Sequence, residues 1–426
     1  MPVYNAFFHG EGRSQYDQNG FDTTSNLDVH SQLGTSQAQL ALAVDSSTPN
    51  EPSVQATAAD GTVYFFSTST GKTWKRTTGG TYSLVNTNAN GAHVNAFFSP
   101  TLNKILYATT TKLGHLVAAT DTFSDSFATF TNGSSYHPMA EVNLTVEIGD
   151  GKYVASVSAS LTFSANALDI PAQYSVTALK NERNWLLIGT VIGANVSQCE
   201  AFLWDTFSSS WTEQDTIYEI GVNCFIEADS FTYAQCGTEG NIYYWTGNRM
   251  PFFYQIRNVT TSHGHQKSGV LNGKPLLAIG TDIYSVYKRQ GEIDIVVHEY
   301  TTTTGSVVSI GVTGTQLLVS NGSNVNKIGT NRSTATATTP RTDGAVKTVI
   351  VPYESLNGGT LSLETSVNDS GFVLESGFIN DATNSRYILQ RGVSYAGKIN
   401  HSKSRITITP SGANSPVIQG INVVTE

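Results

Sequence analysis

The sequence predicts an all-β protein whose larger part repeats one unit of four short strands. Apolar residues alternate with polar ones over short runs, and Gly, Asn, Asp and Ser bound these runs, as expected for strands joined by turns. Helical periodicity is almost absent. A strand that ends in small residues, a turn and a strand rich in Tyr, Phe or Trp recur about seven times between Ala38 and Pro340.

The spacing of this unit predicts a seven-bladed β-propeller. A four-stranded propeller blade needs about 40–50 residues. Equivalent points lie 39 to 51 residues apart, at Thr57, Ala108, Glu147, Ile188, Gln235, Ile279 and Val319. The long first unit and the compressed third unit leave six blades as the alternative count. Enzymes, lectins and assembly proteins share this fold, so the fold alone does not determine the function.

Two predicted blades illustrate the expected order of strands. Each consists of four runs separated by turn residues. The first blade is predicted from residues 38–44, 53–59, 62–68 and 73–77, and the fifth from residues 218–228, 230–236, 241–247 and 251–256.

The two ends of the chain differ from the repeats. Residues 1–37 are polar and loop-like apart from one short apolar run, and we expect a leader or docking arm there. A shift to Thr, Ala and Pro at Asn331–Ala345 predicts a linker or a last outer strand. Residues 341–426 alternate clearly and predict a small, jelly-roll-like β-sandwich. The expected domains are therefore 1–37, 38–340 and 341–426.

Composition argues against two classes of partner. Charged residues make up 13% of the 426 residues, the net charge is −9, and no run of Lys and Arg occurs. A nucleic-acid groove needs clustered basic side chains, so we expect no nucleic acid. No stretch approaches the roughly 20 apolar residues of a membrane span, and the N-terminus does not resemble a secretory signal. We therefore expect no membrane insertion.

The three cysteines predict buried free thiols. Cys199, Cys224 and Cys236 lie on predicted strands among apolar residues, where a thiol acts as a small hydrophobic group. Their odd number excludes complete pairing within the chain. Zinc sites usually contain a closely spaced pair such as C-x-x-C, which this chain lacks.

One short motif has a structural meaning. Residues 67–74 read STSTGKTW and resemble the Asp box of sialidase-like propellers, S-x-D-x-G-x-T-W, with Ser69 in place of the Asp. The box is a turn between the third and fourth strands of a blade. In that position Gly71 would allow the turn and Trp74 would pack between blades.

The residues required for catalysis are not recognisable, and we expect no enzyme and no catalytic residue. A sialidase needs three arginines and a Tyr–Glu pair, but nothing places Arg249, Arg257 and Arg289 at equivalent blade positions. A glycosidase needs two facing carboxylates. The acids close in sequence read more simply as solvated loop residues; they are Glu213, Asp215, Glu219, Glu227 and Asp229.

Histidines and turn acids give no metal or cofactor site. His263 and His265 lie in a segment rich in Thr, Ser and Gly and predict an exposed loop, and His298 stands apart from them. Asp60-Gly61 and Asp150-Gly151 predict hairpin turns. We therefore expect no bound metal and no cofactor.

Three aromatic residues are the best candidates for contact with a ligand. Trp211, Trp245 and Tyr254 lie near predicted strand ends, where loops carry binding residues. Their faces suit sugar rings, so a glycan or a protein partner could bind there. The alternative is burial between blades, where aromatic side chains are common.

Several segments resemble a known family. Residues 136–171, 201–213 and 273–288 look like blade sequences of propeller-containing structural proteins of tailed bacteriophages. Residues 349–368 and 404–421 resemble the terminal sandwich module of the same proteins. The resemblance implies a virion component of the tail, a fibre or the baseplate, made in the host cytoplasm and used in attachment or assembly.

These observations together predict a non-enzymatic virion structural protein that presents a rigid propeller. Its expected partners are other virion proteins, further copies of itself and a host surface glycan, and weak contacts would add up across copies. One alternative is a glycan-binding or glycan-degrading, sialidase-like propeller with aromatic and acidic residues clustered on one face. An intracellular scaffold propeller is a second alternative, which the low content of charge disfavours.

Overall fold

In the residues that it describes, the computed structural model is all-β apart from one 3₁₀ turn, η1 (Ala382–Asn384). It describes residues 3–4, 23–25, 27–28, 36–45, 49–193, 195–228, 231–256, 259–260, 263–264, 266–288, 294–302, 304–390 and 399–425. The chain divides into two compact units. The larger unit is Ala43–Asp282 with Thr302–Lys327, and the smaller unit is Met1–Leu42, Ile283–Thr301 and Ile328–Glu426.

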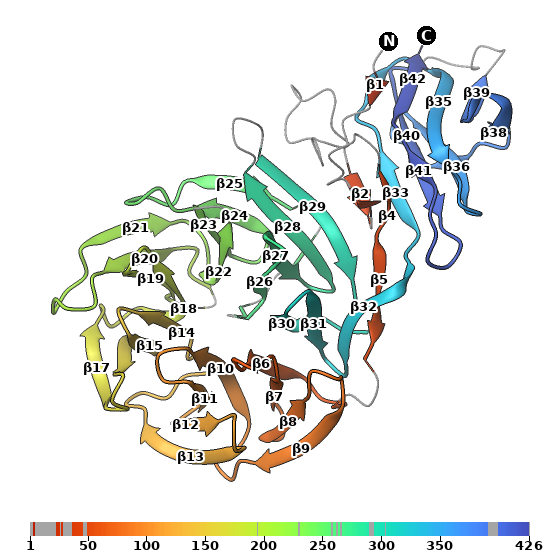
Figure 1. Ribbon diagram of the computed structural model, residues 1–426. Helices are drawn as coiled ribbons and strands as arrows, with labels where there is room; N and C mark the ends of the chain where they lie inside the picture. The colour runs from red at the N-terminus through yellow and green to blue at the C-terminus, as the bar shows by residue number, and fades with distance from the viewer. Residues whose placement is uncertain are drawn as a thin grey trace. The chain divides into compact units, whose positions relative to one another are not determined.

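Seven four-stranded sheets are found among the described residues, and Figure 1 shows their first strands around a common centre. In sheet order they are β6 (Ser53–Thr57), β7 (Val63–Ser67), β8 (Lys72–Arg76), β9 (Tyr82–Thr87); β10 (His93–Ser99), β11 (Lys104–Thr109), β12 (Lys112–Val117), β13 (Thr122–Thr129); β14 (Met139–Val142), β15 (Thr145–Asp150), β16 (Tyr153–Val157), β17 (Phe163–Asp169); β18 (Ser175–Glu182), β19 (Trp185–Val191), β20 (Cys199–Trp204), β21 (Glu213–Ile217); β22 (Val222–Ala228), β23 (Phe231–Cys236), β24 (Asn241–Tyr244), β25 (Phe252–Gln255); β26 (Ser268–Leu271), β27 (Lys274–Ile279), β28 (Asp282–Lys288), β29 (Asp294–Thr301); and β30 (Val307–Thr313), β31 (Gln316–Asn321), β32 (Val325–Arg332), β5 (Leu40–Val44).

The first strands of these sheets form a closed circle within the larger unit. Each lies beside the first strand of the next sheet, and β30 also lies beside β6. Second strands such as β11 and β15 are buried on both faces, whereas the outer strands β9 and β13 contain no fully buried residue. This pattern explains why the second strands read as continuous apolar runs, and the arrangement is that of a β-propeller.

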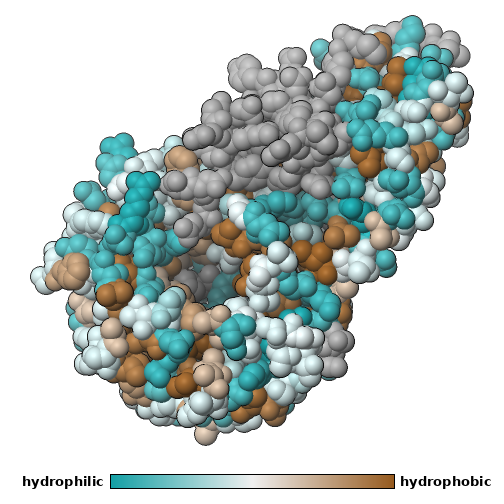
Figure 2. Space-filling view, viewed as in Figure 1, coloured by the Kyte–Doolittle hydropathy of each residue, from teal (hydrophilic) through white to brown (hydrophobic). Residues whose placement is uncertain are grey.

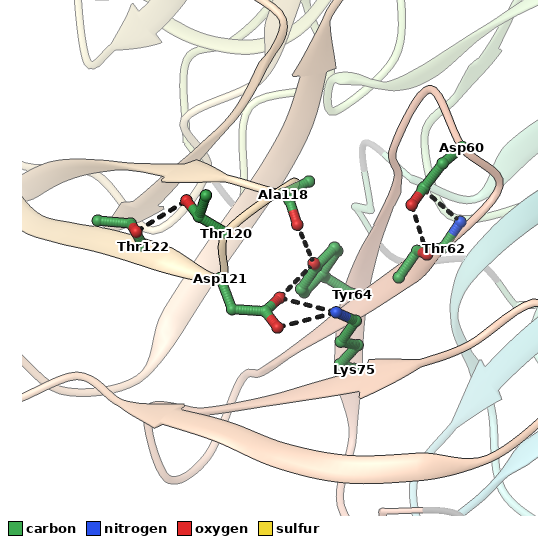
Figure 3. A network of polar contacts seen from close by, with 8 residues as sticks. All are labelled: Asp60, Thr62, Tyr64, Lys75, Ala118, Thr120, Asp121 and Thr122. Atoms are coloured by element: carbon green, nitrogen blue, oxygen red, sulfur yellow. Dashed lines mark hydrogen bonds and ion pairs between the residues drawn. The ribbon is translucent and has the colours of Figure 1, made fainter.

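Apolar clusters and polar contacts join neighbouring sheets. Phe66 on β7 stacks on Tyr107 on β11 with ring centroids 5.2 Å apart. Between β12 and β13, the carboxylate of Asp121 accepts hydrogen bonds from the Tyr64 hydroxyl at 2.6 Å and from Lys75 Nζ at 2.8 Å (Figure 3). Such contacts hold successive sheets face to face.

The strand β5 corrects the predicted first blade. Residues 38–44 were expected to begin that blade, but β5 is the fourth strand of the last sheet, next to β32. The first sheet begins with β6, so the predicted second strand is its first strand. Moving the reference point from Thr57 to Phe66 shortens the first interval from 51 to 42 residues, because Ala108 is equivalent to Phe66.

The same shift moves the Asp-box-like turn. Residues 67–74 join β7 and β8, the second and third strands of the sheet, rather than the third and fourth. Gly71 has φ of +71°, and a Cβ there would lie 2.5 Å from the carbonyl oxygen of Gly91. Trp74 packs against a buried cluster formed by residues of β7, β31 and β32, so its predicted position between blades is confirmed.

The smaller unit contains two further sheets, each of six strands, that share one apolar core. Their strands alternate between buried and less buried residues, as β40 shows. One sheet contains β1 (Val3–Tyr4), β42 (Ile421–Thr425), β35 (Val346–Ser355), β39 (Arg386–Gln390), β38 (Ile379–Asp381) and β41 (Val417–Ile418); the other contains β2 (Thr23–Ser25), β33 (Ala335–Thr338), β40 (His401–Thr409), β36 (Thr360–Val367), β37 (Val373–Leu374) and β34 (Thr342–Asp343). The short strands β3 (Leu27–Asp28) and β4 (Gln37–Ala38) pair with each other.

Of the two alternatives for Asn331–Ala345, the linker is wrong, and the predicted strand is found but in a sheet of the smaller unit. Thr and Ala residues of this segment form β33, which pairs with β40 over four residues, and Ala335 and Ala337 point into the core. Thr is β-branched and favours strands, so a segment rich in Thr need not be a linker. The described parts of the predicted leader also form strands, because β1 pairs with β42 and β2 pairs with β33. Most of that leader lies outside the described residues.

Buried charges fix the end of β5 in the larger unit. Asp45 is 1% exposed and its backbone N–H donates to the Val325 carbonyl at 2.9 Å. Its carboxylate accepts hydrogen bonds from Arg76 Nε at 2.7 Å and the Tyr82 hydroxyl at 3.0 Å, and it lies 2.7 Å from Lys327 Nζ. Burial by itself would raise the pKa of Asp45, but the bonds from Lys327 and Arg76 outweigh it and hold that pKa below 3.8.

Replacing Asp45 should therefore destabilise the protein strongly. Asp45→Ala leaves the Arg76 guanidinium, 5% exposed, without its counter-charge, and we expect a loss of about 3–5 kcal/mol in the free energy of unfolding. Urea titration at pH 7 measures the loss. The depressed pKa of Asp45 stabilises the fold fully at pH values above 3.8. The difference in stability between variant and wild type should therefore shrink only as the pH falls below 3.8.

The matched control is Asp169→Ala, which removes an exposed ion pair with Lys152. Solvent screens such pairs, so the urea midpoint should hardly change. Equal effects of the two substitutions would contradict the role assigned to Asp45.

Candidate functional site

Gln266, two residues before β26, contacts the first strands of three other sheets. The side-chain oxygen of Gln266 accepts a hydrogen bond from the Gln55 N–H at 2.7 Å, and its Nε2 donates to Asn95 Oδ1 at 2.9 Å and to the Ala96 carbonyl at 2.5 Å. The Gln266 carbonyl accepts from the Ile310 N–H at 2.8 Å. One residue therefore bridges β6, β10 and β30, and both polar atoms of its side chain form hydrogen bonds.

A tight turn positions the side chains around Gln266. The Lys267 N–H donates to the Gly264 carbonyl at 3.0 Å, and a Cβ on Gly264 would lie 2.5 Å from Lys267 Cε. A larger residue at position 264 would therefore displace the flexible side chain of Lys267. Next to it, His263 Nε2 donates to the Thr177 carbonyl of β18 at 2.5 Å. The expected exposed loop is wrong for His263, which is half-buried, and His265 lies outside the described residues.

Two cavities lie on either side of Gln266, and Figure 2 looks into the hollow at the centre of this unit. The first cavity has a volume of about 300 Å³ and lies at the beginnings of the first strands; its lining is Val54, Thr68, Val94, Asn95, Ser135, Tyr136, His263, Gly264, Gln266, Lys267 and Ser306 to Val308. The second cavity, of about 560 Å³, lies toward the ends of those strands. Both belong to the larger unit.

The first cavity is lined by both polar and apolar side chains, among them one lysine. Tyr136 meets His263 edge to face, with ring centroids 4.3 Å apart. Lys267 is 9% exposed, and burial lowers its pKa because desolvation disfavours the ammonium form. None of the described residues that line this cavity carries a carboxylate. The arrangement offers hydrogen-bond donors and one cation, without the paired acids of a glycosidase.

The second cavity is larger and is lined by aromatic as well as charged side chains. Phe97, Phe98 and Phe225 contribute to its wall, together with Glu141 and Lys180. The Glu141 carboxylate accepts hydrogen bonds from the hydroxyls of Ser99 at 2.5 Å and Thr101 at 2.6 Å, both in the neighbouring sheet. This acid therefore joins two sheets.

The predicted acids do not gather in either cavity. Glu213 is exposed, and Asp215 accepts a hydrogen bond from the Met250 N–H at 2.7 Å. Glu219 accepts from Asn241 Nδ2 at 2.7 Å and from the Tyr243 hydroxyl at 2.9 Å. The side chain of Glu227 and the whole of Asp229 lie outside the described residues, as do Arg257 and Arg289.

The three predicted contact aromatics are placed apart from both cavities. Trp211 is half-buried, packs on Phe202 with ring centroids 5.1 Å apart and donates to Gln214 Oε1 at 2.9 Å. Trp245 is 4% exposed within an apolar core cluster, which agrees with the alternative of burial. Tyr254 is half-buried on β25. Contact with a ligand at Trp211 and Tyr254 stays a prediction.

Other predicted groups have structural positions. All three cysteines are free and buried, as predicted, and burial raises the pKa of Cys199 and of Cys224 to about 12. Asp60-Gly61 and Asp150-Gly151 lie in hairpin turns, as predicted. In the part of the chain that the structure describes, no group of three or more His, Cys, Asp or Glu residues could hold a metal ion. The described helical content includes no segment long and apolar enough to span a bilayer.

A buried acid that sequence reasoning did not single out is Glu147 on β15. It is 1% exposed, and its Oε1 accepts a hydrogen bond from the Thr145 hydroxyl at 2.7 Å. Its Oε2 is buried and has no hydrogen-bond partner among the described residues. Burial raises the pKa of Glu147 to about 7, because its effect exceeds the opposing effects of the Thr145 and Ser156 hydroxyls.

Glu147 should make stability depend on pH. Between its unfolded pKa of 4.5 and its folded pKa of about 7, the unfolded chain loses a proton that the folded protein keeps. The free energy of unfolding should therefore fall by about 3 kcal/mol as the pH rises through this window, and stay at the lower level above it. Glu147→Gln should remove this fall, which urea titrations from pH 4.5 to 8 measure.

The exposed Glu213→Gln serves as the control and should follow the wild-type profile. A wild type and a Glu147→Gln variant that change in parallel over this range would contradict the buried neutral carboxyl.

Comparison with known proteins gives a likeness of fold. No protein-family model and no curated protein sequence matches the chain. Streptogramin B lyase superposes with a TM-score of 0.52 and 11% identity over 68% of this chain and 96% of that chain. Virginiamycin B lyase from Staphylococcus aureus gives 0.52 and 9% over 68% and 98%, and an extracellular domain of a hybrid two-component system from B. thetaiotaomicron gives 0.50 and 10% over 84% and 47%. At these identities the likeness shows the fold alone.

Proposed function

We propose that this protein is a non-enzymatic structural component of a tailed-phage particle, used in assembly or host attachment. The observation that carries the proposal is that buried and half-buried carboxylates of the larger unit join neighbouring sheets. Asp45, Asp121 and Glu141 are each engaged in contacts that tie one sheet to the next. Such contacts suit a rigid scaffold. The resemblance of the sequence to structural proteins of tailed phages is the reason for proposing a phage particle.

The finer architecture belongs to the same proposal. The seven four-stranded sheets would be seven blades of one propeller, because the circle of first strands closes from β30 to β6. The two six-stranded sheets, with their shared core, would form the jelly-roll-like sandwich. A closed propeller leaves short, protected edges, which limits unwanted strand pairing between the many copies on a particle.

Rigid presentation is the mechanism that follows. A scaffold that does not deform loses little conformational entropy when it docks, so modest contacts to virion proteins or to a host glycan suffice. Several copies on one particle would multiply such contacts. A sialidase-like activity is less well supported, because Arg76 is used in a buried ion pair and the first cavity has no carboxylate among its described lining residues.

Particle fractionation tests the proposal. Particles from a lysate that contains the chain are banded on a density gradient, and each fraction is analysed by quantitative mass spectrometry. We expect the chain in the particle band, in a fixed ratio to the major capsid protein, after a high-salt wash. A soluble host enzyme provides the control for carry-over. A chain that stays with that enzyme at the top of the gradient would overturn the proposal.

A further inference from the structure

One segment of the smaller unit forms an edge of both six-stranded sheets. Among the described residues, β37 is the last strand of one sheet and β38 is the last strand of the other. Residues 371–381 contain both strands, so the two edges belong to one continuous stretch of backbone. The outer side of an edge strand carries backbone N–H and C=O groups, and it is a place where another chain can pair.

This segment presents apolar side chains to solvent. Val373 and Leu374 on β37 are each 65% exposed, and Ile379 on β38 is 61% exposed. Successive side chains of a strand point to opposite faces, so one of the two on β37 would be expected in the core, but neither belongs to it. These three side chains form the edge patch. Clustered apolar side chains on a sheet edge are typical of a contact surface.

Two aromatic residues hold the edge patch in place. The Arg405 guanidinium lies over the Phe372 ring, 4.2 Å from its centroid, and Phe378 packs against the core of the smaller unit. The Glu375 N–H donates to the Leu363 carbonyl at 2.8 Å. The patch is therefore fixed before it meets a partner, so little conformational entropy is lost on contact.

The charges around the edge patch are compensated within the smaller unit. Of the four carboxylates between Glu364 and Asp381, three form ion pairs. The pairs are Glu364 with Arg405, Asp369 with Arg341, and Asp381 with Arg386. The fourth carboxylate, that of Glu375, accepts a hydrogen bond from the Thr365 hydroxyl. A second copy of this surface would therefore meet little repulsion, although the whole chain carries a net charge of −9.

We propose that the edge patch is a contact between two copies of this chain. The segment of one copy lies antiparallel to the same segment of the other across a two-fold axis, so that apolar side chains meet apolar side chains. A contact of this symmetry is closed, and it covers an apolar edge that would otherwise favour aggregation. The inference deepens the assembly role proposed above and rests on it for its biological meaning, because a particle brings many copies together.

Sedimentation velocity of the purified full chain tests the contact. Between about 1 and 500 µM at pH 7, we expect a reversible monomer–dimer equilibrium with a Kd of about 10–100 µM, because the patch is small. Leu374→Lys should raise this Kd at least about tenfold, since it places two ammonium groups in one apolar contact. Val373→Lys should act in the same direction. High salt should leave the wild-type dimer intact, because apolar contacts are not screened.

Leu144→Lys is the matched control. Leu144 is 67% exposed in a turn of the larger unit, so the substitution adds the same charge at a similarly exposed leucine outside the edge patch. It should leave the Kd of the dimer unchanged. Thermal unfolding establishes that each variant is folded. Hydrogen exchange of the wild type gives a second readout, because the amides of residues 373–379 should exchange more slowly as the concentration of the chain rises.

A chain that sediments as a monomer at the highest concentration would refute the contact and leave the edge patch to another protein. So would a folded Leu374→Lys variant with the wild-type Kd, or a Leu144→Lys variant that weakens the dimer equally. Association that continues beyond the dimer would exclude the two-fold arrangement. Particle fractionation does not depend on self-association. A monomeric chain in the particle band would therefore refute the contact alone, and a dimer absent from that band would refute the proposed function alone.

Discussion

The pairing of β5 with β32 is the constraint on which the ring of sheets depends. A strand from near the beginning of the chain completes the last sheet, so the two ends of the repeat are joined by backbone hydrogen bonds rather than by side chains alone. Asp45 then fixes the end of β5 against Arg76 and Lys327, which belong to the first and last sheets. This closure leaves no unpaired edge on β32, and it requires contacts across most of the chain, which slows folding.

Closure of the ring leaves free space near its centre, and the two cavities lie in this space. Second strands are buried on both faces, so the side chains that line the first cavity come from first strands and from described residues of the connecting segments, such as Tyr136 and Gln266. Gln266 lies between the two cavities, and both the oxygen and the nitrogen of its carboxamide are hydrogen-bonded. The closed ring and the small cavity therefore have one origin, the packing of first strands around a common centre.

The sequence predicted strands well and their partners less well. The four runs of the predicted fifth blade coincide with β22 to β25, because alternation and turn residues are local features. Residues 38–44 were read as a strand correctly, but no local pattern shows that β5 pairs with β32, about 280 residues later. The site was missed for the same reason: Tyr136 and Lys267 are distant in sequence and meet only when the ring closes. The one local indication was Gly264 close before Lys267, a turn that brings a lysine inward.

Hydrogen exchange of the intact protein, followed by mass spectrometry, tests the closure most directly. If β5 and β32 hold the ring together, their amides should exchange slowly and at the same rate as those of β6 and β11, as one cooperative unit. Exchange of β5 amides much faster than those of β6, with the remaining sheets still protected, would show that the ring persists without its closing strand. That result would contradict the account.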